Sequence, residues 1–392
     1  AAELQPKQPN ILDSLKLDQA IKLAKKKEKE GSPEEAKRIY QDVLTKFPKS
    51  KTAIGGLKGL ASRPVGKVSK VQDVPEDELQ ALITLYNKGQ LALVVEHAQV
   101  FTEQYPEAFV AWNLIGASAA QIGQLDQAVF AFQRFLAIKP DNAGVHNNMG
   151  NALKAQDKLE EAIEAYKKAL AIKPDYADAY NNMGNALKDQ GKLKEAIKAY
   201  NKVLSLKPDY AEAYYNVGNA LQEHGKLKEA IEAYNKALAI KPDYAEVYNN
   251  LGNALKEQDK LEEAIEAYNK ALTIKPDYAE AYNNMGLALQ EHGKLEEAIK
   301  AYNKALAIKL DYAEAYLNMG NALKEHGKLE EAIETYNKAL DIKPDHADAY
   351  LNMGNALQEQ GKLEQAVEAY NKALAIKPDY AEAKHNLAET LK

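Results

Sequence analysis

From residue 109 to the end of the chain, two kinds of amphipathic segment alternate. Within each segment, apolar residues recur at spacings of three and four, which is the spacing of one face of an α-helix. Short breaks that contain Gly, or Pro followed by Asp, separate the segments, and runs of β-branched residues are absent. The pattern therefore predicts pairs of antiparallel helices joined by tight turns.

The pattern has a period of 34 residues. A proline followed by Asp marks one turn of each period, and Leu310 takes the place of that proline once; the prolines are Pro140, Pro174, Pro208, Pro242, Pro276, Pro344 and Pro378. This register gives eight full repeats over 109–380 and half a repeat over 381–392. Positions within a repeat are numbered 1 to 34 below, so that residues 109, 143 and 177 stand at position 1.

Four positions carry the same type of residue in nearly every repeat. Position 8 is Gly, as in Gly184, and position 20 is Ala, as in Ala196. Positions 4 and 24 are aromatic in most repeats, as in Tyr180 and Tyr200. This signature resembles the tetratricopeptide repeat. The resemblance implies an all-α protein, a right-handed α-solenoid superhelix of helix-turn-helix units, with the first helices on the concave side and the second helices outside.

Two looser copies of the repeat precede the regular array, over 17–50 and 75–108. Between them, Pro64 and Gly66 interrupt any helical pattern, which is typical of a linker. The predicted organisation is an N-terminal helical segment with one divergent repeat (1–61), a linker (62–74), a divergent repeat (75–108), eight repeats (109–380) and a capping half-repeat (381–392).

Several local features follow from the same register. Position 15 is Gly, or Asp in Asp157 and Asp259, and we expect a left-handed residue that ends the first helix. Asp at position 33 with an acidic residue three places later, as in Asp209 and Glu212, predicts a capping box. Leu310 removes a helix stop, so we expect the second helix before it to extend and alter the pitch. All five methionines stand at position 7, which the period places in the core.

Asparagine recurs on the first helix although it is a mediocre helix former. Positions 2, 6, 9 and 13 share one face of that helix. Position 6 carries Asn148, Asn182, Asn216, Asn250, Asn284, Asn318, Asn352 and Asn386. Position 9 carries Asn151, Asn185, Asn219, Asn253, Asn321 and Asn355. A carboxamide has donors and an acceptor, so such a row can pair with the main chain of an extended peptide whatever its side chains.

The position-6 residues resemble the asparagine ladder in the tetratricopeptide superhelix of O-linked N-acetylglucosamine transferases, which grips peptide backbones. The resemblance implies the same role at position 6. Two other interpretations stay open: position-9 asparagines can bond to neighbouring repeats, and near-identical copies can simply reflect duplication.

Apolar residues interrupt the row of amides at Tyr215, Leu317 and Leu351 (position 5) and at Leu287 (position 9). The three leucines fall in consecutive repeats, so we predict that they form a pocket for an apolar side chain of the bound segment. Drift on a solvated face is the alternative.

Charge narrows the class of partner. The formal net charge is −6, yet residues 1–74 hold 16 Lys and Arg against 9 Asp and Glu, which leaves −13 on the remainder. Position 2 is acidic in most repeats, so we expect a groove with a negative rim that prefers neutral or basic segments and repels nucleic acid. Position 5 lacks the lysine that chaperone-binding relatives use for acidic tails, which disfavours such a ligand.

Catalysis and cofactors find little support in the sequence. There is no Cys, and no nucleophile–base set, phosphate loop or catalytic carboxylate pair stands out from the period. His224, His292 and His326 share position 14 but lack matching carboxylates, so we expect no metal and no cofactor. No apolar run has the length of a bilayer and no signal-peptide pattern opens the chain, so we expect no membrane insertion and a cytoplasmic protein.

The function predicted from the sequence is a non-catalytic scaffold that binds an extended peptide segment in a concave groove lined by asparagine. Two alternatives remain. The array can be the recruiting arm of a larger transferase, since long tetratricopeptide arrays precede glycosyltransferase and bacterial sulfotransferase domains, and residues 1–108 are similar to the latter. It can also associate weakly with itself.

Overall fold

The computed structural model describes residues 16–29, 33–62 and 74–392, and every regular element within these ranges is an α-helix. The chain divides into two compact units, Ala1–Gln80 and Ala81–Lys392, called here the N-terminal unit and the main unit. The boundary lies within α4 (Glu76–Asn87). The predicted linker 62–74 lies, apart from Ser62 and Val74, outside the described residues.

The N-terminal unit contains α1 (Leu17–Lys29), α2 (Pro33–Lys46) and α3 (Lys51–Ser62), and α1 and α2 pack as an antiparallel pair with α3 against both. Its core holds Tyr40, which is 1% exposed, among small side chains such as Ala20 and Ala24. This is the helix pair that the sequence predicts for the divergent repeat 17–50.

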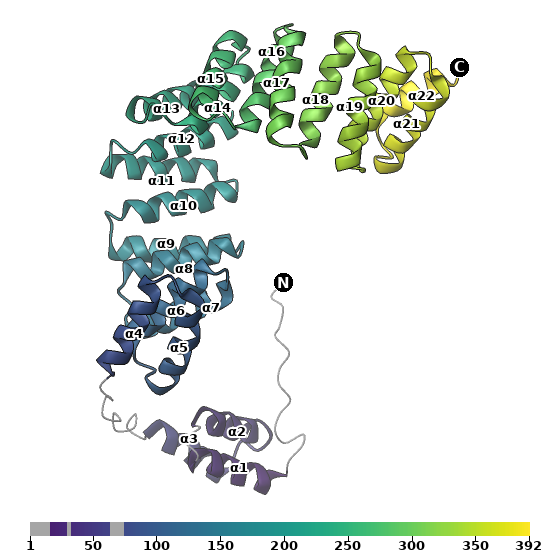
Figure 1. The fold of residues 1–392 in the computed structure, drawn as a ribbon. Coiled ribbons are helices and arrows are strands. Elements are labelled where there is room, and N and C mark those ends of the chain that lie inside the picture. The colour runs from purple at the N-terminus through teal and green to yellow at the C-terminus, as the bar shows by residue number, and fades with distance from the viewer. Residues whose placement is uncertain (1–15, 30–32, 63–73) are drawn as a thin grey trace. The chain divides into compact units, whose positions relative to one another are not determined.

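The main unit starts with α4 and α5 (Leu91–Gln104) and continues as pairs of helices (Figure 1). The first helices of the repeats are α6 (Phe109–Gln121), α8 (Ala143–Ala155), α10 (Ala177–Asp189), α12 (Ala211–Glu223), α14 (Ala245–Glu257), α16 (Ala279–Glu291), α18 (Ala313–Glu325), α20 (Ala347–Glu359) and α22 (Ala381–Thr390). The second helices are α7 (Leu125–Ile138), α9 (Leu159–Ile172), α11 (Leu193–Leu206), α13 (Leu227–Ile240), α15 (Leu261–Ile274), α17 (Leu295–Ile308), α19 (Leu329–Ile342) and α21 (Leu363–Ile376).

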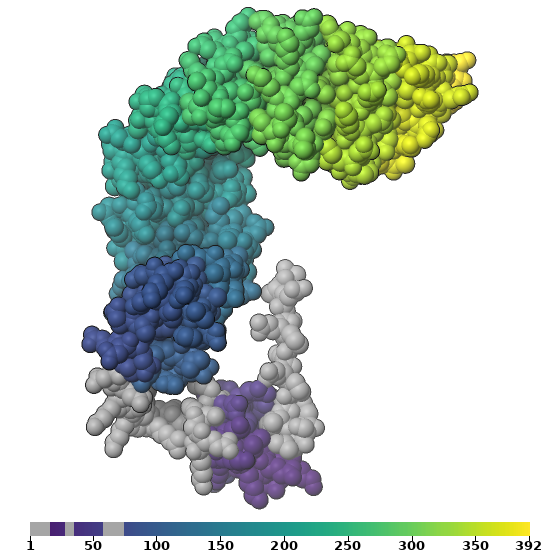
Figure 2. All heavy atoms as spheres, viewed as in Figure 1, coloured from purple at the N-terminus to yellow at the C-terminus, as the bar shows by residue number. Residues whose placement is uncertain are grey.

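The contacts between repeats differ on the two sides of the main unit. From α6 onward each helix packs against the next, and each first helix also contacts the first helix of the following repeat, as α14 does with α16. Second helices of successive described repeats make no such contact. In a curved stack the more closely spaced elements lie on the inside, so the first helices line the concave side. The repeats of the main unit meet without a gap between them (Figure 2).

The close approach within a repeat depends on Gly at position 8. A Cβ built on Gly184 would lie 2.5 Å from Cε1 of Tyr200, the position-24 residue of the same repeat, and the other repeats show the same relationship. The position-24 tyrosines from Tyr166 to Tyr370 are fully buried. Met319 and Met353 are buried, and Met285 packs against the core, as the period predicts for position 7.

The turn after the first helix is as predicted. The position-15 glycines have positive φ, for example 73° at Gly191, and Asp157 and Asp259 have φ of 61°. The predicted capping box is wrong. The residue before the first helix is position 34, as in Tyr210, and its side chain caps no backbone N–H, except in Asn142, whose Oδ1 accepts from Val145 N–H at 3.0 Å. Instead Glu212 in the first turn of the helix accepts a hydrogen bond of 3.0 Å from the Tyr210 hydroxyl.

The predicted extension at Leu310 is also wrong. Helix α17 ends at Ile308, at the same position as its neighbours, and Lys309 has extended backbone with its N–H bonded to the carbonyl of Ala305. Leu310 is 76% exposed in the turn that follows. The turn therefore forms without proline, because the packing of the next repeat fixes where the chain must reverse.

Candidate functional site

The position-6 asparagines from Asn182 to Asn386 reach across to the preceding repeat. Nδ2 of Asn182 donates to Oδ1 of Asn147 at 3.0 Å. The equivalent bonds run from Asn216 to Asn181 (2.9 Å), from Asn284 to Asn249 (3.1 Å) and from Asn318 to Asn283 (3.1 Å). The four acceptors stand at position 5 and are buried, with 4–7% exposure. The bond satisfies a carboxamide oxygen that would otherwise be costly to bury.

Where position 5 is not Asn, the position-6 amide finds another acceptor. Nδ2 of Asn250 donates to the hydroxyl of Tyr215 at 3.1 Å and to Oδ1 of Asn219 at 2.9 Å. After Leu317 and Leu351, the bonds go to position 9 of the preceding repeat, from Asn352 to Asn321 (2.9 Å) and from Asn386 to Asn355 (2.8 Å). Each of these amides thus donates through Nδ2 to the preceding repeat, Asn250 twice.

The position-9 asparagines accept a hydrogen bond from the core. The position-24 tyrosine hydroxyl of the same repeat donates to Oδ1 at 2.7–2.9 Å, in the pairs Tyr166–Asn151, Tyr200–Asn185, Tyr234–Asn219, Tyr268–Asn253, Tyr336–Asn321 and Tyr370–Asn355. Leu287 removes this acceptor in one repeat, and Tyr302 there donates to Gln290 at 3.1 Å. Burial raises the pKa of these tyrosines, to about 12 for Tyr370.

These internal bonds use only half of each carboxamide. At position 6, Oδ1 has no protein partner among the described residues, except in Asn250, whose Oδ1 accepts from Asn249 at 3.2 Å. At position 9, Nδ2 likewise has no partner within the described part of the chain. None of these atoms belongs to the buried polar atoms that lack a partner, so they face solvent. Position 6 therefore presents an acceptor and position 9 a donor, repeat after repeat; this surface of Asn side chains is called the amide wall.

Family models match helices of both units. A model described as "Tetratricopeptide repeat" matches residues 110–142, another of that description matches 16–50, and one described as "TPR repeat" matches 150–191. The chain belongs to the tetratricopeptide-repeat family. A model described as "Cilia and flagella-associated protein 70 C-terminal domain" matches residues 176–390, more than half of the chain, so the chain also belongs to the family of repeats that this model describes.

Two solved structures with TM-scores above 0.5 share the solenoid fold. A tetratricopeptide repeat protein from Parabacteroides merdae is 20% identical with a TM-score of 0.51, over 64% of this chain and 99% of that chain. The APC/C hetero-tetramer Cut9-Hcn1 is 15% identical with a TM-score of 0.51, over 96% and 76%. YrrB, described as a TPR protein with an unusual peptide-binding site, is 27% identical with a TM-score of 0.42, over 48% and 97%. A comparison with curated proteins gives no match.

Tetratricopeptide arrays are in general non-catalytic scaffolds for protein–protein interaction, and this chain has their architecture. Within the described residues, no group of three or more His, Asp or Glu side chains is placed to hold a metal ion. None of the helices in the same part of the chain has the length and apolarity that crossing a bilayer requires.

The three leucines that the sequence places in an apolar pocket do not all lie at the surface. Leu351 is 2% exposed and belongs to the core, so its predicted contact with a ligand is wrong. Leu287 and Leu317 are half-buried and pack against the same core cluster. Tyr215 is half-buried, with its ring 5.4 Å from that of Tyr244. A leucine at position 5 fills the volume of a buried asparagine, which explains why it points inward.

Charged and amide side chains of positions 12 and 13 form a second row of bonds along the first helices. Position 12 of one repeat pairs with position 13 of the next in Lys154–Asp189 (2.8 Å), Gln222–Glu257 (2.6 Å), Lys256–Glu291 (3.1 Å) and Gln290–Glu325 (2.7 Å). In the pairs with Gln at position 12, no positive charge within the pair balances the glutamate at position 13. This row makes the edge of the amide wall negative.

Sequence reasoning missed the position-5 asparagines, the buried acceptors between repeats. Asn147, Asn181, Asn249 and Asn283 each lie 35 residues before the amide that they receive. The signal was present in the sequence, because position 5 is polar in the middle of a buried helix stripe. Only the packing of one repeat on the next shows which partner it has.

Proposed function

We propose that the amide wall of the main unit binds an extended segment of another protein through the main chain of that segment. The observation that supports this is the pair of open groups that most repeats present: Oδ1 at position 6 and Nδ2 at position 9. An extended chain offers N–H and C=O groups in alternation, and it needs acceptors and donors in alternation to satisfy both.

The internal bonds favour tight binding because they fix the wall before the guest arrives. The Tyr268 hydroxyl holds Oδ1 of Asn253, so Nδ2 of Asn253 stays turned to solvent. Nδ2 of Asn284 donates a hydrogen bond to Asn249, which leaves Oδ1 of Asn284 on the open side. A surface that is already ordered loses less side-chain entropy on binding. The amide wall thus combines a structural role with a surface suited to a guest main chain.

The charges at the edge of the wall favour a neutral or basic guest. Glu257 and Glu325 each receive an amide donor and no cation from the preceding repeat. At position 2, Asp178 and Glu246 lie 3.5 and 3.6 Å from Lys207 and Lys275, so part of that rim is already paired. The uncompensated glutamates attract basic side chains of a guest and repel nucleic acid.

The test replaces the open donor and keeps the internal bond. In the variant Asn185→Asp/Asn219→Asp/Asn253→Asp, a carboxylate oxygen still accepts from each tyrosine hydroxyl, while the other oxygen replaces Nδ2. The matched control places the same charges on the outer helices, as Asn201→Asp/Asn235→Asp/Asn269→Asp, where all three side chains are exposed. Peptides are selected on the wild-type chain from a random 15-residue phage library, and uncharged ones are measured by fluorescence anisotropy.

The wall variant should lose at least about tenfold in affinity, the equivalent of ~1.4 kcal/mol, and the control should bind like the wild type. Equal affinities for the wall variant and the control would end the proposal. The measurement is repeated at high salt, because screening removes the general effect of added charge but not the loss of a hydrogen bond.

The alternatives from the sequence are variants of this proposal. As the recruiting arm of a transferase, the wall would hold the substrate protein of the attached enzyme. In self-association, the guest would be a second copy of the chain. Sedimentation equilibrium of the wild type and the wall variant tests self-association. Only self-association through the wall would give the two proteins different average masses in solution.

A further inference from the structure

Three bonds that recur along the first helices are missing at one place, where repeat 109–142 meets repeat 143–176. Phe132 and Ala117 replace the tyrosine–asparagine pair of positions 24 and 9. Ala120 and Ala155 replace the pair of positions 12 and 13. Asn148, unlike the later position-6 residues, is exposed and makes no hydrogen bond to another described residue.

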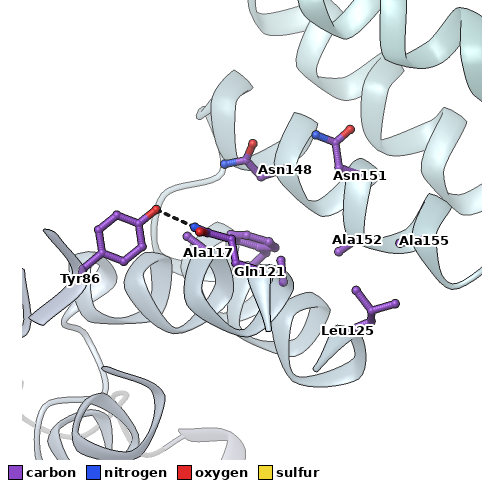
Figure 3. A pocket seen from close by; sticks show the side chains of 10 residues that line it. Tyr86, Ala117, Gln121, Leu125, Asn148, Asn151, Ala152 and Ala155 are labelled. Carbon is purple, nitrogen blue, oxygen red and sulfur yellow. Dashed lines mark hydrogen bonds between the residues drawn. The ribbon is translucent and has the colours of Figure 1, made fainter. Parts of the chain in front are cut away.

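The missing side chains leave a cavity of about 320 Å³. Its floor is apolar and includes Phe132, Leu125 and the alanines at 117, 120, 152 and 155. At its rim lie the carboxamides of Asn148 and Asn151, and opposite them Gln121, whose Nε2 donates to the hydroxyl of Tyr86 at 3.1 Å (Figure 3). No lining residue carries a charge.

We propose that this cavity is an anchor pocket for one large uncharged side chain, that of leucine or phenylalanine. The proposal rests on the proposed function, since the side chain belongs to the segment that the amide wall holds. Asn148 and Asn151 continue the wall to the edge of the cavity, so a main chain that meets them places one side chain over the floor. The volume lies at the lower end of the range for small-molecule sites, which suits a single side chain.

The lining also defines what the pocket rejects. A carboxylate or ammonium group would lose its hydration with no opposite charge to pair with. An alanine side chain of the guest would leave most of the apolar floor in contact with water. At four later junctions between repeats, positions 12 and 13 form a bonded pair instead, such as Lys154 with Asp189 at 2.8 Å. The anchor pocket therefore fixes the register of the guest segment on the wall, which main-chain contacts alone do not fix.

The experiment uses three capped amino acids as probes on the full chain: N-acetyl-leucine methylamide, N-acetyl-phenylalanine methylamide and N-acetyl-aspartate methylamide. NMR follows the side-chain amide signals of Asn148 and Asn151. The variants Ala120→Lys/Ala155→Asp and Ala117→Asn/Phe132→Tyr fill the pocket with residues that other repeats carry at the same positions. Their thermal midpoints are measured first, and two independent ways of filling keep the test valid if one variant folds poorly.

The leucine and phenylalanine probes should shift both signals in the wild type and bind at least about tenfold more weakly to each filled variant, as expected for one lost apolar burial. The aspartate probe should shift neither. Equal binding to wild type and filled variants, or equal binding of the aspartate probe, would overturn the anchor pocket. Because no peptide is used, loss of the pocket with intact peptide binding refutes this inference alone, and failure of the amide-wall variant with intact probe binding refutes the proposed function alone.

Discussion

The hydroxyl of Tyr268 on α15 donates a hydrogen bond of 2.7 Å to Oδ1 of Asn253 on α14. Tyr268 is fully buried, whereas Asn253 is half-buried. One carboxamide thus has its oxygen in the core and its nitrogen at the surface. This hydrogen bond ties the amide wall to the core. Substitutions of Asn253 can therefore separate its contribution to the stability of the protein from its role in binding.

Asn253→Ala should lower the free energy of unfolding more than Tyr268→Phe does. The alanine leaves the Tyr268 hydroxyl buried without an acceptor, at a cost of about 1–3 kcal/mol, whereas removal of the hydroxyl costs only the net bond, about 1 kcal/mol. The double variant should cost less than the sum of the two, because the buried donor is gone. Urea denaturation of the four proteins measures this, and strict additivity would show that the bond carries no coupling energy.

Gly252→Ala should destabilise the main unit. The new Cβ would lie 2.6 Å from Cε1 of Tyr268, and such overpacking costs about 1–3 kcal/mol. Gly144→Ala is the control, because the nearest atom to its Cβ is Oδ1 of Asn142 at 3.4 Å, an ordinary contact, and alanine has the better helix propensity. Thermal and urea unfolding should rank Gly252→Ala below wild type and Gly144→Ala at or above it.

Leu310→Pro should stabilise the protein by about 0.4–1 kcal/mol, mainly by restricting the unfolded chain. The turn has the same form as the proline-containing turns, and Lys309 is already extended, with φ −127° and ψ 95°, as a residue before proline must be. The backbone N–H of Leu310 makes no hydrogen bond to the described backbone that proline would break. A drop in the urea midpoint would mean that the turn differs from its counterparts.

Stability should fall above pH 10. A tyrosine in the unfolded chain ionises near pH 10, whereas burial raises the pKa of Tyr370 to about 12 and those of Tyr166 and Tyr268 further. Between these values the unfolded chain releases a proton that the folded chain keeps. The contribution is complete below pH 10 and is lost as pH rises, by no more than about 1.4 kcal/mol per pH unit for each tyrosine.

Urea denaturation of the wild type and of Tyr370→Phe between pH 8 and pH 11.5 checks this sign. The phenylalanine variant cannot ionise at that position, so its stability should fall less steeply with pH. Lysine deprotonation contributes equally to both proteins and cancels in the comparison. Parallel curves for the two proteins would contradict the assignment to tyrosine.

Much of the fold could be predicted because the 34-residue period carries it. Gly184 and Tyr200 recur together because one must be small for the other to be buried, and Gly191 recurs because its φ of 73° suits glycine. The helix ends were harder to predict. Aspartate is a favoured N-cap residue, so Asp209 indicates a helix that starts directly after it. The helix instead begins at Ala211, after Tyr210. Packing of the repeats overrides a capping preference of about 1 kcal/mol.

The sequence alone determined the repeat, its register, the all-helical architecture and the face on which the asparagines gather, because helical periodicity and the glycine, alanine and proline positions are local properties. Only the tertiary structure decided what each amide does. Asn182 and Asn147 are 35 residues apart and become partners through the stacking of two repeats, and Leu351 turns into the core for the same reason. The partners that bond across a junction between two repeats, and the cavities between helices, arise only when the elements pack together.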